Sequence, residues 1–286
     1  ERSVKLSSKG GTINPNLTIG AKVNSTIRLK ANAGISNQGV TPLGIGFRLE
    51  ESDLHMLRYS AAELPSVLKP YLIGRDLVQT TETKFIIDLF GLTEKQAREK
   101  WPDLMQIVID RVKPERMQKK RESYRKKWWI FAEPRSLLRP ALDSVTRFVA
   151  TCRTARHRLF VFVPSGTLPD AKIVAIALPD SFALAALSSS IHQAWAERIG
   201  VRMGVGNDLN YNHADCFVKF PFPSPDDATL ERIRNLGEQL DAHRKRQQVL
   251  HPGLTLTGMY NVLERLRAFE AGIIKYPLRG GDGRGK

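Results

Sequence analysis

Short apolar runs recur along the chain and are rich in β-branched and aromatic residues. The clearest are FIIDLF at 85–90, RLFVFVP at 158–164 and KIVAIAL at 172–178. Their length and composition predict buried strands. Shorter strands are predicted at 46–49, after a glycine-rich turn, and at 25–29 within an otherwise polar segment.

Apolar residues at helical spacing mark residues 51–69 and 94–127. Thr93 is suited to cap the second region, and Glu94 places an acidic group in its first turn. Pro102 and Pro114 interrupt the backbone hydrogen bonds of a helix, so the pattern predicts two or three helices there.

The C-terminal third is predicted to be helical. Residues 181–199 indicate a buried helix that stops at Gly200. The segment FPFPSPDD at 220–227 cannot continue a helix or a strand because of its prolines, and it predicts a boundary. Helices are expected beyond it at 228–250, with an apolar stripe, and at 255–268. The order of elements predicts an α+β fold, a mixed sheet with flanking helices followed by a small helical C-terminal domain.

Charge is concentrated in two places. The chain has a net charge of +15, from 44 Lys and Arg against 29 Asp and Glu. A dense basic run at 111–127 is followed by Trp128, Trp129 and Phe131, and a second basic cluster lies at 153–158. Clustered cations beside aromatic residues are typical of surfaces that contact nucleic-acid phosphates. The alternative for each run is a solvated helix face.

Other bulk properties narrow the class of protein. No apolar run approaches the roughly 18 residues that a membrane span requires, so we expect no membrane association. The two cysteines, Cys152 and Cys216, fit a reducing compartment better than a disulfide framework, and we expect a cytoplasmic protein. The chain has no initiator Met, which leads us to expect a piece of a longer protein.

Catalytic motifs are absent from the sequence. There is no Pro-Pro dipeptide, and so no Asn-Pro-Pro-Tyr loop of an amino-methyltransferase, and no phosphate-binding loop, nucleophile elbow or paired-cysteine zinc spacing. His213, Asp215 and Cys216 lie close together but lack a second pair of metal ligands.

One motif suggests a nuclease. Asp76, Glu82 and Lys84 form D-x5-E-x-K, similar to the metal site of restriction nucleases, in which carboxylates on adjacent strands bind Mg²⁺. The six-residue spacing leaves little room for two strands, so an exposed loop is the favoured interpretation.

A family resemblance emerges from a series of longer phrases that occur in order over nearly the whole chain. They are LTIGAKV (17–23), ANAGISNQGV (31–40), KPYLIGRDL (69–77), VKPER (112–116), YRKKWWIFAEPR (124–135), FVATCRTARHRLFVF (148–162), HQAWAERIG (192–200), NDLNY (207–211) and CFVKFPFP (216–223). The chain resembles MmeI-type enzymes, which are single-chain DNA methyltransferases, some of them fused to an endonuclease in restriction–modification systems.

The resemblance implies a division of the chain and a function. Residues 1–35 would connect to a methyltransferase domain of the same parent chain, 36–223 would form a target recognition domain, and 224–286 a helical C-terminal domain. It implies recognition of double-stranded DNA for an adenine-N6 methyltransferase that uses S-adenosylmethionine. The chain itself would hold no cofactor or metal and have no catalytic residues.

Roles for individual residues follow from their chemistry within this expectation. Arg can bind guanine O6 and N7 bidentately, so we assign base readout to TCRTARHR. Its candidate residues are Arg153, Thr154, Arg156, His157 and Arg158. Phosphate contacts, which fix register without reading sequence, are assigned to Arg75, Lys113, Arg116, Lys119, Lys120, Arg121 and Arg125.

Alternatives stay open for each assignment. Arg153 and Arg156 would contact only phosphate in one of them. Gly74–Asp76 predicts a turn that points Arg75 outward with Asp76 orienting it, or a structural Arg–Asp pair. Trp128 and Trp129 would stack on DNA or lie in the core. For the whole chain, the alternatives are a stand-alone specificity subunit that docks a separate methyltransferase and a Mg²⁺-dependent nuclease using Asp76 and Glu82.

Overall fold

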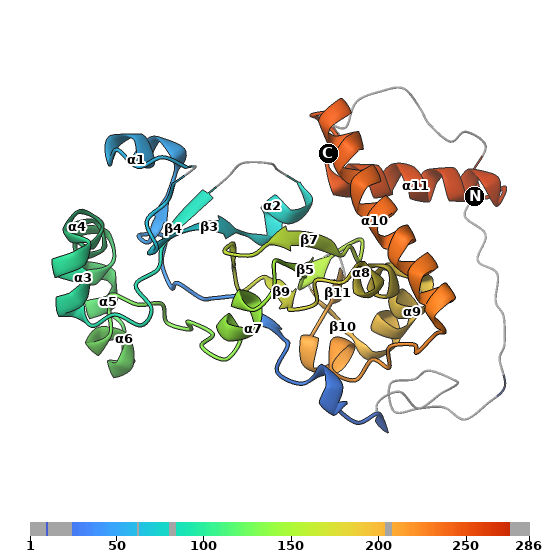
Figure 1. Cartoon of the computed structure of the whole chain (residues 1–286), viewed down its shortest axis with the longest axis horizontal. Helices are drawn as coiled ribbons and strands as arrows, with labels where there is room; N and C mark the ends of the chain where they lie inside the picture. The colour runs from blue at the N-terminus through green and yellow to red at the C-terminus, as the bar shows by residue number, and fades with distance from the viewer. Residues whose placement is uncertain (1–9, 11–24, 62, 80–83, 204–207, 275–286) are drawn as a thin grey trace, which may run out of the picture.

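The computed structural model describes residues 10, 25–61, 63–79, 84–203 and 208–274. Among them, helices and open sheets alternate along the chain, as Figure 1 shows, and the fold is α+β as expected. The helices between residues 94 and 126 lie at the left end of that view and those between 227 and 270 at the upper right, with the central sheet between them.

The central sheet is antiparallel, in the order β1 (Ser36–Gln38), β9 (Ile173–Ile176), β5 (Arg147–Cys152) and β7 (Val161–Pro164). The side chains of β5 alternate between two buried layers. Phe148 and Ala150 face one apolar cluster, and Val149 faces the other. Both faces of β5 are therefore covered, which explains why the predicted strands in this part of the chain are continuous apolar runs.

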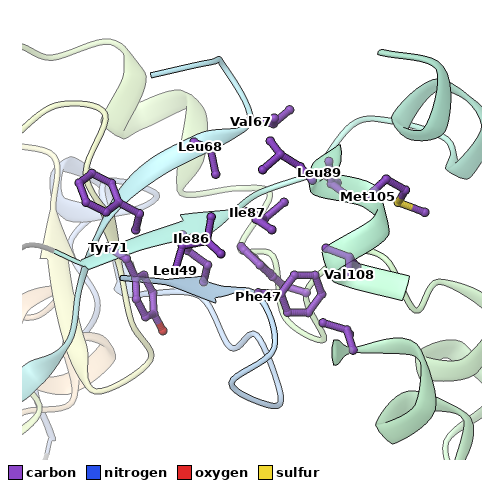
Figure 2. Close-up of a cluster of buried hydrophobic side chains, with 14 of the residues drawn as sticks. Phe47, Leu49, Val67, Leu68, Tyr71, Ile86, Ile87, Leu89, Met105 and Val108 are labelled. Atoms are coloured by element: carbon purple, nitrogen blue, oxygen red, sulfur yellow. The ribbon is translucent and has the colours of Figure 1, made fainter. Parts of the chain in front are cut away.

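The second sheet is mixed, in the order β2 (Arg48–Leu49), β4 (Lys84–Ile87), β3 (Leu68–Leu72) and β8 (Leu168–Pro169). Strands β3 and β8 run parallel, whereas the other pairs are antiparallel. Figure 2 shows its apolar face, where Phe47, Ile87 and Leu89 pack against Met105 and Val108 of a helix. This contact joins the second sheet to the helices at the left of Figure 1.

Four short helices occupy the region for which two or three were predicted. They are α3 (Glu94–Lys100), α4 (Pro102–Arg111), α5 (Lys113–Met117) and α6 (Glu122–Lys126). Thr93 caps α3 through a reciprocal pair of hydrogen bonds with Gln96, which confirms the predicted start. Pro102 and Pro114 sit in the first turns of α4 and α5, where a missing N–H costs nothing.

Two predicted elements are wrong. The helix expected at 51–69 is limited to α1 (Glu51–Met56), because Arg58 has a φ of 60° and the chain then enters β3. The strand expected at 25–29 does not form. Leu29 donates a single backbone hydrogen bond to Val218, and a short 3-10 helix, η2 (Lys30–Asn32), follows.

Two of the C-terminal helices pack on the central sheet through Leu184, Leu187 and Ala196, which share an apolar cluster with Val149 and Ile176. The predicted helix at 181–199 is divided into α8 (Ser181–Ser188) and α9 (Ser190–Ile199), because the side chain of Ser189 caps the second helix. Helix α10 (Asp227–Leu250) begins at the Asp226 cap and lies against α8, and α11 (Leu256–Glu270) follows. In the described residues, none of the helices is both long enough and apolar enough to cross a membrane.

Candidate nucleic-acid interface

The predicted readout segment forms a short strand, β6 (Thr154–Ala155), directly after β5. It pairs with β11 (Asp208–Asn210), which pairs in turn with β10 (Val201–Met203). The backbone of Arg153 is fixed on both sides, since its N–H donates to Lys172 at 2.7 Å and its carbonyl accepts from Tyr211 at 2.6 Å. Side chains of this segment therefore project from a rigid support.

A concavity of about 740 Å³ opens beside β6. Among the residues that the structure describes, four cationic side chains from three separate parts of the sequence and one acidic side chain, that of Asp208, line it. The lining residues include Arg75, Arg153, Thr154, Arg156, Lys172, Asp208, Asn210 and Thr257. The concavity therefore combines positive charge, which attracts phosphates, with N–H donors, which can form hydrogen bonds to base edges.

Arg75 reaches this concavity from α2 (Gly74–Val78). Helix α2 is held against the end of β5, because the buried Cys152 thiol donates to the Gly74 carbonyl at 3.1 Å. A side chain in place of Gly74 would meet Lys172 at 3.3 Å, so the glycine permits this close packing. The structure thus brings Arg75 next to the readout segment, a contact that no sequence pattern predicted.

Three predicted readout residues line the concavity, and they differ in their exposure and in their contacts within the protein. Thr154 is exposed, and the side chain of Arg156 is 67% exposed and lies 3.3 Å from Glu264. Arg153 is half-buried and donates from Nη1 to Gln38 of β1 at 2.8 Å. An arginine held by one of its nitrogens keeps further N–H donors for a ligand.

Arg158 does not face the concavity, and its assignment to base readout is not supported. It is 8% exposed and lies over the Tyr211 ring at 5.0 Å. Its guanidinium donates to Leu209 O at 2.7 Å, to Thr151 Oγ1 and to Cys152 O. Burial lowers the pKa of Arg158. Its hydrogen bonds to carbonyl oxygens connect β5 to β11.

His157 is also directed away from the concavity. Its side chain is 7% exposed, with Nε2 2.8 Å from Oδ1 of Asn261 and Nδ1 3.3 Å from Oε1 of Glu264. Both ring nitrogens are therefore engaged by α11. This contact to the C-terminal helix replaces the base contact that the sequence suggested.

Arg116 is the clearest correction among the predicted phosphate contacts. It is 0% exposed, and it donates to Pro42 O at 2.5 Å and Ile130 O at 3.1 Å. Its guanidinium also lies over the ring of Phe47 at 5.8 Å. Burial lowers its pKa, and no phosphate can approach it in this structure.

Lys113, Lys119 and Arg125 have partners within the protein. Lys113 lies over the Trp128 ring at 4.9 Å, and Lys119 pairs with Glu115 at 2.8 Å. Arg125 donates to the carbonyls of Lys119 and Lys120, at 2.6 and 2.7 Å. Such ion pairs and loop contacts at a surface leave the cations partly free for an anion.

Lys120 and Arg121 are exposed on the same lobe, and Arg121 lies over the ring of Tyr124 at 5.0 Å. Trp128 is buried and Trp129 donates to Leu92 O, so the paired tryptophans belong to the core rather than to a stacking surface. We call the exposed cations Lys120 and Arg121, in the loop between α5 and α6, and Lys126 of α6 the α5–α6 surface. Figure 1 shows this lobe at one end of the molecule, away from β11.

The nuclease-like motif forms an ion pair. Lys84 Nζ lies 3.0 Å from both carboxylate oxygens of Asp76, which joins α2 to β4, while Glu82 falls outside the described residues. His213 and Cys216 lie in a single π-helical turn, η3 (His213–Phe217), where burial raises the pKa of Cys216 to about 11. In the part of the chain that the structure describes, no group of three His, Cys, Asp or Glu residues is arranged to hold a metal.

Lys172, Asn210 and Glu264 were not singled out by the sequence. Lys172 precedes an apolar strand and Asn210 is the last residue of the short strand β11, without a motif at either position. Lys172 and Asn210 lie beside β6 because β9 pairs with β5 and β11 pairs with β6. Glu264 lies there because α11 contacts Arg156 and His157. All three positions depend on contacts between distant parts of the sequence.

The comparisons with known proteins agree with this architecture. Residues 36–224 match the family described as MmeI, target recognition domain. A solved structure of the Type IIL restriction-modification enzyme MmeI in complex with DNA has a TM-score of 0.69 and 16% identity, and the match covers 89% of this chain and 33% of that one. The chain thus spans about a third of that protein. A search of curated protein sequences found no match.

The fold is that of an α+β recognition domain, with the cation-lined concavity beside β6. The chain belongs to the MmeI target recognition domain family.

Proposed function

We propose that this chain recognises a specific sequence in double-stranded DNA for a restriction–modification enzyme. The observation that carries the proposal is the concavity beside β6, where Arg75, Arg153, Arg156 and Lys172 converge from separate parts of the sequence. Arg153 and Arg156 read base edges, and Arg75 and Lys172 neutralise phosphates beside them.

The α5–α6 surface serves as a second, sequence-independent anchor in this proposal. Its cations lie on α6 and in the loop before it, and Arg125 of α6 holds that loop by donating to the carbonyls of Lys119 and Lys120. Phosphate contacts at a distance from the concavity would fix the register and orientation of the duplex.

The catalytic partner belongs to the same proposal. DNA recognition here would act for an adenine-N6 methyltransferase domain of a longer parent chain, which would bind S-adenosylmethionine and act in the cytoplasm. The family to which residues 36–224 belong supports the recognition role, and the family resemblance of the sequence supports the methyltransferase partner.

The test is equilibrium binding of the 286-residue chain to a random-sequence duplex between 50 and 200 mM salt. Each phosphate contact lowers the slope of log K against log salt by about 0.9, so four to six contacts give a slope of about −4 to −5. An affinity that stays constant over this range would contradict the proposal. A double substitution of the exposed Lys120 and Arg121 by alanine should make the slope less steep by about two units.

A further inference from the structure

Helix α11 packs against the readout segment through its first half. Thr257 lines the concavity, and Tyr260 lies beside His157 with the ring centroids 6.0 Å apart. Asn261 and Glu264 hold the two nitrogens of the His157 ring. Helix α11 therefore forms part of the wall of the concavity beside β6.

Glu264 contacts two consecutive residues of that segment with its two carboxylate oxygens. Oε1 lies 3.3 Å from Nδ1 of His157, and Oε2 lies 3.3 Å from Nη2 of Arg156. His157 is buried and held at its other nitrogen by Asn261, so it fixes the position of the carboxylate. The carboxylate in turn restrains the long, exposed side chain of Arg156.

We propose that Glu264 is a positioning residue that orients the Arg156 guanidinium for base recognition. The proposal rests on the proposed function, because it assigns a role within the same DNA-binding concavity. It places part of the specificity of the site on the C-terminal helix, outside the residues 36–224 that match the family.

The ion pair between Arg156 and Glu264 contributes little to the stability of the protein. The side chains of Arg156 and Glu264 are 67% and 52% exposed, and a surface ion pair of this kind contributes about 0 to 1 kcal/mol. Its geometric consequence is larger. Glu264 accepts one of the two Nη2 hydrogens and so restrains the guanidinium. The other Nη2 hydrogen, together with an N–H of either Nη1 or Nε, remains as a parallel pair of donors for guanine O6 and N7. Holding a recognition group in its bound geometry lowers the entropy cost of binding.

The experiment measures discrimination rather than affinity alone. The wild-type chain first selects its preferred duplex from a random library, and binding is then compared with duplexes changed at one base pair at a time. Lost Arg readout corresponds to a loss of about 5- to 150-fold in preference at one base pair. We expect Arg156→Ala to remove this preference and Glu264→Gln to remove most of it.

Two variants separate position from charge. Glu270→Gln removes the same charge from an exposed position on the same helix, and it should leave the preference unchanged. Glu264→Asp keeps the charge but withdraws the carboxylate by one methylene, and it should weaken the preference without a change in affinity for unrelated DNA. In the Arg156→Ala background, Glu264→Gln should have no further effect on preference. Thermal unfolding of each variant establishes that it is folded.

Distinct outcomes overturn the two proposals. Equal discrimination by Glu264→Gln, Glu270→Gln and the wild type overturns the positioning role while DNA recognition stands. Tighter binding of Glu264→Gln than of Glu270→Gln to every sequence, with discrimination intact, also overturns it, because Glu264 would then only compete with DNA. A wild-type chain that binds no duplex, or binds all sequences equally, overturns both.

Discussion

Some arginines of this chain are buried and stabilise the fold, whereas others line the concavity. The neighbouring residues in the sequence do not distinguish the two kinds. Arg156 and Arg158 are two residues apart in one basic cluster, yet one is exposed and the other is buried among carbonyls. A basic run predicts a charged surface on average. The direction of each side chain depends on strand pairing, which is fixed by tertiary contacts.

Arg158→Ala should lower the free energy of unfolding by about 2 to 5 kcal/mol. The substitution leaves the acceptors on Thr151, Cys152 and Leu209 without their buried donor, and it removes the side chain beside Tyr211. Chemical denaturation measures the change. Arg156→Ala is the matched control, with an expected change within about 0.5 kcal/mol. Equal effects of the two substitutions would contradict the structural role of Arg158.

His192 should make the protein sensitive to acid. It is fully buried against Phe160, Phe220 and Tyr211, with Nε2 2.9 Å from the Tyr211 hydroxyl, and burial lowers its pKa from 6.5 to about 3. Between pH 6.5 and pH 3, His192 is therefore protonated in the unfolded chain but neutral in the folded chain. Stability from this residue is complete above pH 6.5 and is lost as the pH falls toward 3, by up to about 1.4 kcal/mol per pH unit.

The measurement is the free energy of unfolding between pH 7 and pH 5 for the wild type and for His192→Gln, which retains a polar group opposite Tyr211. The slope should be smaller for the variant. His213, whose pKa is also lowered by burial, adds a slope of the same sign, so His213→Gln serves as a comparison. Parallel pH profiles for the wild type and His192→Gln would contradict the assignment.

At the scale of elements, the sequence predicted best where local signals and burial coincide. The Thr93 cap and the strands β7 and β9 were found because a capping residue and β-branched apolar runs act locally. The helix predicted at 51–69 is too long because the helical spacing of apolar residues continues past Met56, whereas the backbone turns at Arg58. The strand β6, which supports the site, has only two residues and a polar sequence, so it is defined by its pairing with β11 alone.

The packing of α10 on α8 depends on Gly237. A Cβ atom at this position would lie 2.3 Å from the carbonyl oxygen of Ser181, which is backbone and cannot move aside without shifting a helix. Gly237→Ala should therefore destabilise the protein by about 1 to 3 kcal/mol, although alanine favours helix. Gly253→Ala, which meets nothing within 4 Å, is the control for thermal unfolding. An unchanged or raised melting temperature for Gly237→Ala would contradict the close approach.

At the scale of the molecule, two basic regions lie apart on one scaffold. The α5–α6 surface carries exposed cations on the lobe at the left of Figure 1, and the concavity beside β6 collects cations from α2, β6 and the start of β9. We infer a division of labour in which the first region anchors the duplex and the second reads it. The net charge of +15 predicted a polyanionic partner, but the division depends on the fold.

The most direct test of this account is selection of preferred duplexes from a random library by the wild-type chain and three variants, followed by sequencing. Arg153→Ala and Arg156→Ala should each relax the preference at one base pair and preserve the rest of the selected motif. The double substitution of Lys120 and Arg121 by alanine should preserve the whole motif and weaken binding to all sequences about equally. If Arg153→Ala and Arg156→Ala select the wild-type motif and lose only affinity, the concavity beside β6 is not where the sequence is read.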